Sequence, residues 1–370
     1  MKNNGNEKLA LVCLGSFTNR GKLVEKYINE KIGSKNEKFV IDINEVRFSN
    51  GEAKTQLLEP IRGKDVFIIA DVSNHSCTYK MFGNENRMSP DDHFQDIKRA
   101  ISAMNGRAKR ITVVMPLLYA SRQHRKRSRE SLDCAIALQE LVRLGVNNIV
   151  SFDIHAPDVQ NAIPINVFDN IIPSFAILEH FITQEAANIN KEKMLIISPD
   201  IGATERAIKY ASMLGIDMGL TYKRRDYTVI KNGKNPVVEF AYLGRDVKSK
   251  SCVIVDDMIA SGGTIIDVAR ELKSKGAKDV SVITTFALFN DGLESFDKLY
   301  KDGVLKSVYS TNLNYLSKDT IERPWFKEVD LTPFIARVII TLNRGESMTK
   351  VIDSKERIAT LLKKWQKERR

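Results

Sequence analysis

Short apolar runs of strand length alternate along this chain with longer segments in which apolar residues recur at helical spacing. Runs rich in Val, Ile and Leu indicate buried strands, and apolar residues at i, i+3 and i+4 indicate amphipathic helices. In the first half the expected strands are 9–14, 39–43, 66–70, 111–115 and 148–152, and the expected helices are 21–32 and 131–144. In the second half the expected strands are 194–198, 252–255 and 280–286, and the expected helices are 204–214 and 265–275.

The alternation of strand and helix occurs twice, which is typical of βαβ units in parallel sheets with helices on both faces. We therefore predict an α/β protein with two tandem doubly wound domains, 8–172 and 173–330, and mainly parallel sheets. The length of 370 residues suits two domains. Two further amphipathic helices, 331–342 and 352–365, are expected in a C-terminal segment, 331–370, that ends in a basic tail.

The segment from Cys252 to Ile266 combines an apolar strand, an acid pair, a small-residue loop and a helix. Asp256 and Asp257 are expected at the carboxyl end of the strand, where carboxylates accept hydrogen bonds from sugar hydroxyls or hold a cation. The loop Ser261-Gly262-Gly263-Thr264 precedes an expected helix N-terminus, which favours an anion, and its glycines allow backbone N–H groups to approach a ligand closely. We interpret the segment as a site for a phosphorylated ribose; the simpler interpretation is an ordinary strand–turn–helix connection with two solvated acids.

Two other polar residues follow predicted strands. Asp200 lies between a strand and a helix, so it either faces the same crevice as Asp256 or caps its helix. His155 follows another strand, and its position leaves a metal or phosphate role as open as a structural one. The segment 47–52 is a turn with one aromatic residue and several polar groups, which taken alone indicates no function.

Residues 222–250 are expected to form a β-hairpin flap with cations at its root. Lys223-Arg224-Arg225 begins the segment, and the turn 231–236 separates the stretches 227–230 and 237–243. A flap of this kind would bring positive charge to a polyphosphate and exclude water. A solvated basic hairpin explains the pattern equally well.

The formal net charge of +11 suits polyanionic partners such as nucleotides or phosphosugars. The segment 122–129 contains five basic residues, and 355–370 contains seven basic and two acidic residues. No helix-turn-helix, zinc-finger or stacking-aromatic pattern accompanies these runs, so we expect no nucleic-acid partner. The simplest interpretation of the basic tail is the solvated end of an amphipathic helix.

Membrane and disulfide classes are also disfavoured. No apolar run reaches membrane-spanning length, and the first eight residues lack the apolar core of a signal peptide. The four cysteines are widely spaced without a CxxC pair, which is typical of free thiols in a reducing compartment. We therefore expect a cytoplasmic protein with no membrane partner.

An ordered set of motifs resembles the ribose-phosphate pyrophosphokinase (PRPP synthetase) family over residues 9–351. The motifs are Phe48-Ser-Asn-Gly-Glu52, Gly63-Lys-Asp-Val-Phe-Ile-Ile69, Tyr119-Ala-Ser-Arg-Gln123, Asp153-Ile-His-Ala156, Ser198-Pro-Asp-Ile-Gly202, Lys223-Arg-Arg225, Val255-Asp-Asp-Met-Ile259, Ser310-Thr-Asn312 and Asn343-Arg-Gly-Glu-Ser347. The resemblance implies two phosphoribosyltransferase-like domains. It also implies transfer of diphosphate from ATP to the anomeric hydroxyl of ribose 5-phosphate, giving 5-phosphoribosyl 1-diphosphate and AMP for nucleotide biosynthesis.

The resemblance further implies roles for individual residues. Lys223 and Arg225 would be the catalytic cations of the flap, and His155 and Asp200 would hold Mg²⁺. Expected ATP contacts are Phe48, Asn50, Gly51, Glu52, Arg122 and Gln123. Expected ribose 5-phosphate contacts are Arg225, Asp256, Asp257, Ala260, Ser261, Gly262, Gly263 and Thr264. Family members form dimers in which the Phe48 turn reaches a neighbouring active site, and these dimers often assemble into hexamers.

The chain departs from the family pattern at several positions. Ala260 stands where the family usually has aspartate, Ser121 is an extra residue, and 72–98 is longer and more polar than is usual. Ala260 leaves room for a catalytically weak paralogue that binds nucleotide or phosphoribose and regulates a partner. A nucleobase phosphoribosyltransferase is disfavoured by the complete N-terminal domain and by the absence of an acid at position 260.

Overall fold

The computed structural model describes residues 8–34, 36–126, 128–225, 237–352 and 355–368, and within them the side chains of all but 223–225, 237–240, 350, 355 and 366–368. The chain divides into two compact units. The first contains the described residues up to Pro173, together with 312–315 and those in 330–353. The second contains the described residues within 174–311, 316–329 and 355–368, so the C-terminal residues contribute to both units.

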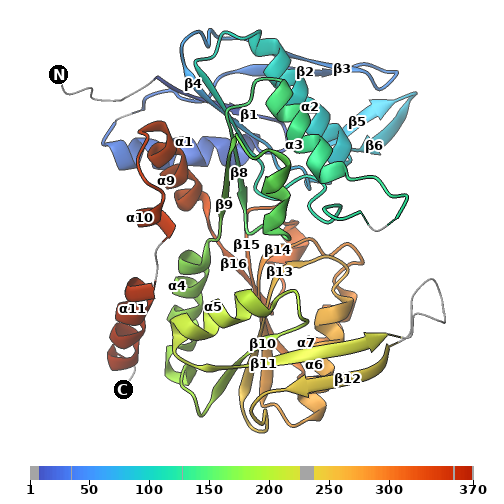
Figure 1. Cartoon of the computed structure of the whole chain (residues 1–370), viewed down its shortest axis with the longest axis vertical. Helices are drawn as coiled ribbons and strands as arrows, with labels where there is room; N and C mark the ends of the chain where they lie inside the picture. The colour runs from blue at the N-terminus through green and yellow to red at the C-terminus, as the bar shows by residue number, and fades with distance from the viewer. Residues whose placement is uncertain (1–7, 35, 127, 226–236, 353–354, 369–370) are drawn as a thin grey trace. The chain divides into compact units, whose positions relative to one another are not determined.

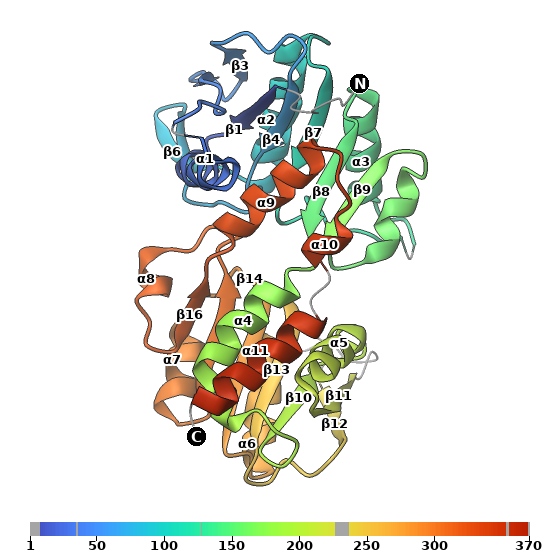
Figure 2. The same cartoon turned by 90° about the vertical axis from the view of Figure 1, so that its left-hand side faces the viewer.

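The first unit is built on a five-stranded parallel sheet with the order β1-β4-β7-β8-β9 (Figure 1). Helices lie on both of its faces (Figure 2), which buries the strands and explains their nearly continuous apolar sequences. The strands are β1 (Leu9–Cys13), β4 (Asp65–Ile69), β7 (Arg110–Val114), β8 (Asn148–Phe152) and β9 (Val167–Ile171). The helices are α1 (Thr18–Ile32), α2 (Pro90–Met104), α3 (Asp133–Arg143), α9 (Thr332–Asn343) and α10 (Thr349–Ile352), with a 3₁₀ turn, η1 (Pro157–Ala162).

Alternate residues of the strands divide the core of this unit into two layers. Ala10, Val66 and Val113 belong to the cluster that contains the apolar residues of α2 and α3. Helices α1 and α9 pack together on the opposite face. Two antiparallel hairpins complete the unit: β2 (Ile43–Arg47) with β3 (Ala53–Leu57), and β5 (Thr78–Met81) with β6 (Asn84–Arg87).

The second unit contains a seven-stranded sheet with the order β12-β11-β10-β13-β14-β15-β16. Neighbouring strands are parallel except β11 and β12, which are antiparallel. The strands are β10 (Met194–Ser198), β11 (Asp217–Arg225), β12 (Val237–Leu243), β13 (Ser251–Ile259), β14 (Asp279–Ala287), β15 (Leu305–Thr311) and β16 (Phe326–Val329). The helices are α4 (Ser174–Glu185), α5 (Thr204–Leu214), α6 (Gly263–Ser274), α7 (Glu294–Lys301), α8 (Lys318–Ile321) and α11 (Lys355–Glu368), with a 3₁₀ turn, η2 (Ala186–Asn188).

Helices again cover both faces of the sheet. The apolar residues of α6 and α7 join one core cluster with Leu195, Ile254 and Val282. Phe181 of α4 packs edge-on against Tyr309 of β15 with ring centroids 5.1 Å apart. Helix α11 contacts α4 and α5, so the helical part of the basic tail packs on the unit. No helix in the described ranges is long and apolar enough to cross a membrane.

The predicted α/β class with mainly parallel sheets is confirmed, and β8 and α5 have the predicted bounds. The strand predicted at 39–43 is wrong, because only Val40 forms an isolated bridge with Leu11. The amides of Phe39 and Val40 both donate to the Glu25 carboxylate, at 2.6 and 2.7 Å, which interrupts a regular ladder. The next strand, β2, begins at Ile43 and pairs with β3 instead.

Strand β13 is longer than predicted. Its pairing with β14 continues as far as Ile259 opposite Ala287. Asp256 and Asp257 therefore lie inside the strand and do not follow it, which corrects their expected position. The connection that follows has only three residues, 260–262, before α6 begins at Gly263.

Gly262 is the residue that allows this short connection. Its φ is +82°, in the left-handed region that disfavours residues with a Cβ. A Cβ at this position would lie 2.5 Å from Cε2 of Phe296. Both the backbone conformation and the contact with the Phe296 ring therefore require glycine.

Replacing Gly262 with alanine is expected to destabilise the second unit. The left-handed conformation alone costs a residue with a Cβ about 1–2 kcal/mol, and the collision with Phe296 adds to this. Urea unfolding of the full chain should give a lower midpoint for Gly262→Ala. Gly263→Ala is the matched control, since the nearest atom to a Cβ at Gly263 is Ser261 Oγ at 4.0 Å. Equal midpoints for the two variants would contradict this account.

Candidate functional site

Two adjacent carboxylates lie near the carboxyl end of β13. Asp257 is buried and Asp256 is half-buried. Asp256 Oδ1 accepts from the amide of Asp257 at 2.9 Å, and Asp257 Oδ1 accepts from the amide of Met258 at 2.8 Å. These bonds orient both carboxylates.

Burial raises the pKa of Asp256 well above its ordinary value. The neighbouring charge of Asp257 raises it further, and Asp200 acts in the same direction, whereas the cation of Arg206 opposes them. Burial and the neighbouring carboxylates therefore oppose ionisation of Asp256. Such a site favours ligands that bring hydrogen-bond donors or positive charge.

Asp200 lies exposed between β10 and α5. Its Oδ1 accepts from the amide of Ala203 at 3.0 Å, so the side chain helps to form the turn that leads into α5. Its charge also acts on Asp256, because β10 and β13 are neighbouring parallel strands. Asp200 therefore stabilises the turn before α5 but does not cap the helix, whose N-cap residue is Ala203. It lies at the same sheet edge as Asp256.

The connection from β13 leads into the uncapped N-terminus of α6. In the described part of the chain no side chain caps α6, and its first turn contains no acidic residue. The first amides of the helix and its dipole therefore favour a negative ligand. The amide of Asn290 donates to the Ala260 carbonyl at 2.9 Å, which fixes the start of the loop. Ser261 and Gly263 are exposed, and Thr264 is half-buried.

The hairpin predicted for 222–250 is present in the backbone as the antiparallel pair β11 and β12. Lys223 lies opposite Phe240, and Arg225 lies opposite Val237. The side chains of Lys223 and Arg225, and the whole of 226–236, lie outside the described residues. The catalytic roles expected for the two cations therefore remain predictions.

In the first unit, residues 48–52 form the turn of the β2–β3 hairpin. The Phe48 amide donates to the Glu52 carbonyl at 2.8 Å, and Asn50 and Glu52 exchange two further hydrogen bonds at 3.0 and 3.1 Å. The Phe48 ring is 44% exposed. The turn is thus ordered while its aromatic ring remains accessible.

The β5–β6 hairpin supports this turn. The Phe82 amide donates to the Ser49 carbonyl at 2.8 Å, and Arg47 lies over the Tyr79 ring at 5.0 Å. Gly51 has a φ of +91°, and a Cβ there would lie 2.7 Å from Met81 Sδ. The polar segment 72–98 therefore contains a hairpin that packs against the predicted ATP-contact turn.

Arg122, Gln123 and His155 lie in two loops that follow strands of the first unit. Arg122 and Gln123 are exposed after β7, and His155 is exposed after β8. His124, which had no predicted role, directly follows Gln123 in the loop after β7. Its ring meets that of His155 edge-on, with centroids 5.4 Å apart. Burial lowers the pKa of His124, and the nearby His155 lowers it further.

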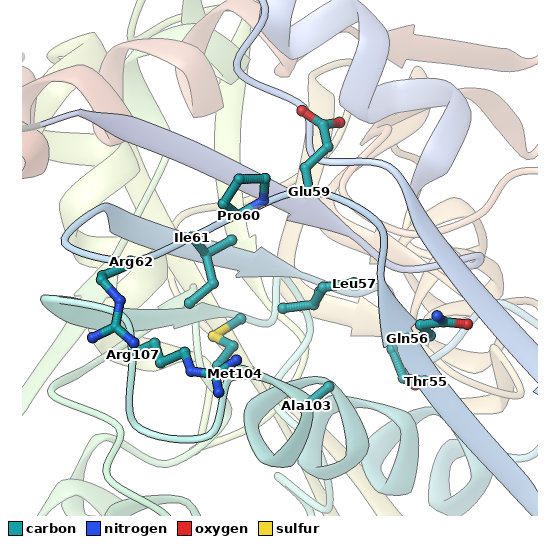
Figure 3. A pocket seen from close by; sticks show the side chains of 10 residues that line it. All are labelled: Thr55, Gln56, Leu57, Glu59, Pro60, Ile61, Arg62, Ala103, Met104 and Arg107. Carbon is teal, nitrogen blue, oxygen red and sulfur yellow. The ribbon is translucent and has the colours of Figure 1, made fainter.

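The two residues expected to hold Mg²⁺ lie one in each unit: His155 in the first and Asp200 in the second. Within the described ranges, no three His, Cys, Asp or Glu side chains gather as a metal site. A pocket of about 430 Å³ also lies in the first unit, between β3, the segment after it and the end of α2 (Figure 3). Its walls include Leu57, Arg62 and Arg107, but none of the predicted site residues.

Sequence reasoning missed two residues that face the predicted site residues. Arg206, in the first turn of α5, is the cation that acts on Asp256. Its signal was present in the sequence, because it lies one helical turn beyond the strand-end motif that contains Asp200. His124 directly follows Arg122 and Gln123, but only the folded chain brings it to His155.

Two family models match the chain in sequence order. The first, the N-terminal domain of ribose phosphate pyrophosphokinase, matches residues 21–145, and the second, the phosphoribosyl transferase domain, matches residues 168–312. The ribose-phosphate pyrophosphokinase of Vibrio cholerae is 33% identical over 308 residues, covering 82% of this chain and 88% of the relative. That of Ureaplasma parvum is 30% identical over 358 residues, covering 94% of this chain and 96% of the relative.

A solved structure agrees with these matches at the level of fold. The crystal structure of phosphoribosylpyrophosphate synthetase from Mycobacterium smegmatis has a TM-score of 0.71 and 24% sequence identity, and the match covers 91% of this chain and 99% of that chain. The two domain models together span most of the chain, and the resemblance drawn from the ordered motifs is confirmed. This chain belongs to the ribose-phosphate pyrophosphokinase family.

Proposed function

We propose that this protein transfers diphosphate from ATP to the anomeric hydroxyl of ribose 5-phosphate, giving 5-phosphoribosyl 1-diphosphate and AMP for nucleotide biosynthesis. The observation that carries the proposal is the β13–α6 connection. It presents a carboxylate pair and an uncapped helix N-terminus within one short segment, in a chain that belongs to the family. One end of a phosphorylated sugar suits the carboxylates, and the other suits the helix.

The two parts of ribose 5-phosphate would bind to different parts of this connection. The 5-phosphate would accept hydrogen bonds from the backbone amides of 261–264, where the α6 dipole favours an anion. The ribose hydroxyls would donate to Asp256 and Asp257. Ala260 offers no carboxylate, but its carbonyl is held by the Asn290 amide, so the shape of the loop does not depend on an acid at this position.

ATP would bind Arg122 and Gln123 through its phosphates and polar edges. The Phe48 turn, with Asn50, Gly51 and Glu52, would contribute an aromatic face for adenine from a neighbouring subunit. Its exposed ring and its ordered backbone suit a surface that projects into another copy of the chain. The proposal therefore includes self-association as a dimer that shares its sites, and assembly of dimers into a hexamer.

His155 and Asp200 would hold Mg²⁺, which when bound neutralises phosphate charge and orients the nucleotide. The Asp200 carboxylate and the nucleotide phosphates would supply the oxygen ligands that Mg²⁺ prefers, with several waters, and His155 would add a single nitrogen ligand. The Asp200 carboxylate is oriented by the Ala203 amide. Lys223 and Arg225 would stabilise the charge that develops on the transferred group. Diphosphoryl transfer depends mainly on such positioning and charge neutralisation.

The central test is AMP formation from ATP, ribose 5-phosphate and Mg²⁺ by the full-length protein. Lys223→Ala is expected to lower kcat by on the order of 10²-fold, because the transition state loses a preorganised cation. Lys191→Ala, which removes an exposed lysine, is the matched control and should retain the wild-type rate. Absence of turnover by the wild type would refute the proposed activity. An undiminished rate for Lys223→Ala would refute the role of this lysine.

The raised pKa of Asp256 predicts a conflict between stability and ligand binding. Folding raises this pKa, so the native state binds the proton more tightly than the unfolded chain does. Ionisation of Asp256 therefore lowers the stability of the folded protein as the pH rises above the pKa that Asp256 has in the unfolded chain. Without ligand, Asp256→Asn should raise the urea midpoint at pH 7.5, and the gain should shrink as the pH falls towards 4.

The same substitution should weaken binding of ribose 5-phosphate, measured by calorimetry. The asparagine amide has an NH₂ donor in place of one carboxylate oxygen that would accept a hydrogen bond from a ribose hydroxyl. Asp302→Asn, at an exposed position, is the control for the loss of one carboxylate. A midpoint for Asp256→Asn that stays at or below that of the wild type across this pH range would argue against the account.

A further inference from the structure

We propose that His124 and His155 together bind a divalent transition-metal ion, of the class of Mn²⁺, Co²⁺ or Zn²⁺, whose remaining ligands include nucleotide phosphate oxygens and water. The inference rests on the proposed function for the identity of the nucleotide. It adds His124 as a further ligand of the metal ion proposed at His155. It also predicts that this metal site prefers ions that bind imidazole.

The distance between the two rings fits a shared metal ion. Their centroids are 5.4 Å apart, and the rings meet edge-on at an interplanar angle of 64°. Two imidazoles bound to one ion at about 2.1 Å from each nitrogen hold their centroids roughly 5 Å apart. The centroid separation is therefore compatible with one ion bound by both rings.

The hydrogen bond of His124 selects the tautomer that a metal requires. Nδ1 of His124 lies 3.1 Å from the carbonyl oxygen of Ser121. A carbonyl only accepts, so Nδ1 carries the proton and Nε2 of the neutral ring carries the lone pair. Histidine ligands in metal sites commonly donate their second nitrogen to a backbone carbonyl in this way.

Both loops that carry the histidines are fixed to the core of the first unit. Before His124, the Tyr119 ring stacks on Phe94 with centroids 4.3 Å apart, and its hydroxyl donates to Asp91 at 2.6 Å. Before His155, the amide of buried Asp153 donates to the Ile171 carbonyl at 3.1 Å. The histidine pair is therefore preorganised by contacts that do not involve a metal.

The charges around the pair suit a metal bound together with a polyphosphate. Arg125 acts on His124 with positive charge, and Asp158 acts on it with negative charge. Arg122 is also close in sequence, so a bare cation would meet local repulsion. A polyphosphate neutralises the arginines and supplies oxygen ligands at the same time. The site should therefore bind the metal more tightly with nucleotide present than without it.

Imidazole changes which cation is preferred. Mg²⁺ favours oxygen ligands and binds imidazole weakly, whereas affinity for nitrogen ligands rises from Mn²⁺ towards Cu²⁺. A second imidazole beside His155 should therefore favour a transition-metal ion over Mg²⁺. The extra residue Ser121 supplies the carbonyl that orients His124, which gives this departure from the family pattern a structural role.

The test measures Co²⁺ binding to the untagged full-length protein. Equilibrium dialysis gives the affinity, and the visible absorption of the bound ion reports its ligands. It is done with Co²⁺ alone and with Co²⁺ plus the non-transferable analogue α,β-methylene-ATP, each against excess Mg²⁺. We expect His124→Asn and His155→Asn each to weaken Co²⁺ binding about tenfold or more, and to change the absorption spectrum. Mg²⁺ binding should change less in His124→Asn than Co²⁺ binding does.

His180→Asn is the matched control. His180 is a partly buried histidine of α4 that packs against Tyr309 in the second unit, and its loss should leave Co²⁺ binding and the spectrum unchanged. Urea unfolding of each variant shows whether the fold is retained, and His124→Gln provides a second variant if His124→Asn does not fold. Wild-type Co²⁺ affinity in a folded His124 variant would overturn the inference.

The outcome is separable from that of the proposed function. Mg²⁺-dependent AMP formation combined with unchanged Co²⁺ binding in the His124 variants would refute the histidine pair alone. Co²⁺ binding that depends on both histidines, in a protein that releases no AMP, would support the pair and refute the proposed reaction.

Discussion

Parallel pairing of buried strands is the constraint on which the site residues depend. A parallel sheet must be covered on both faces, so each strand is followed by a helix that returns the chain to the same edge. In the second unit this brings the residues after β10 to the same edge as the end of β13. Asp200 and Asp256 consequently interact although they are far apart in the sequence.

The acid pair shows that the fold tolerates an unfavourable local arrangement at this edge. Asp256 is desolvated beside Asp257, and only the charge of Arg206 opposes the resulting rise of its pKa among the interactions described. A well-packed apolar side chain at position 256 would stabilise the fold more than the desolvated carboxylate does. Conflicts of this kind are expected at binding sites, so the arrangement is best understood as a cost that a ligand relieves.

Much of the fold was predictable because its signals are local. Helix α5 has the predicted bounds because apolar spacing and Gly215, in the left-handed conformation, mark its end. Helix α2 was missed although Ser89 and Asp92 form a capping box and Pro90 lies in the first turn. The strand expected at 39–43 failed because Glu25, distant in sequence, binds two of its amides. Side-chain acceptors of this kind are not visible in a pattern of apolar residues.

The candidate site was less predictable than the sheet. The phosphate loop and the acids could be located from residue types and order, because a strand, small residues and a helix follow one another directly. The length of β13 could not, since it depends on how far β14 pairs with it. The pairing of His124 with His155 depends on the folding of two separate loops. Sequence order carries no record of that proximity.

The contact between Gly262 and Phe296 has a consequence for the motion of the loop. Phe296 stacks on Trp325, which is fully buried and donates to Asp297 at 2.8 Å. The loop thus rests directly on an aromatic core. Amides near Gly262 should therefore exchange with deuterium mainly through openings that disturb this core. A ligand would then meet a rigid, preformed cradle, and little of its binding energy would be spent on ordering the backbone.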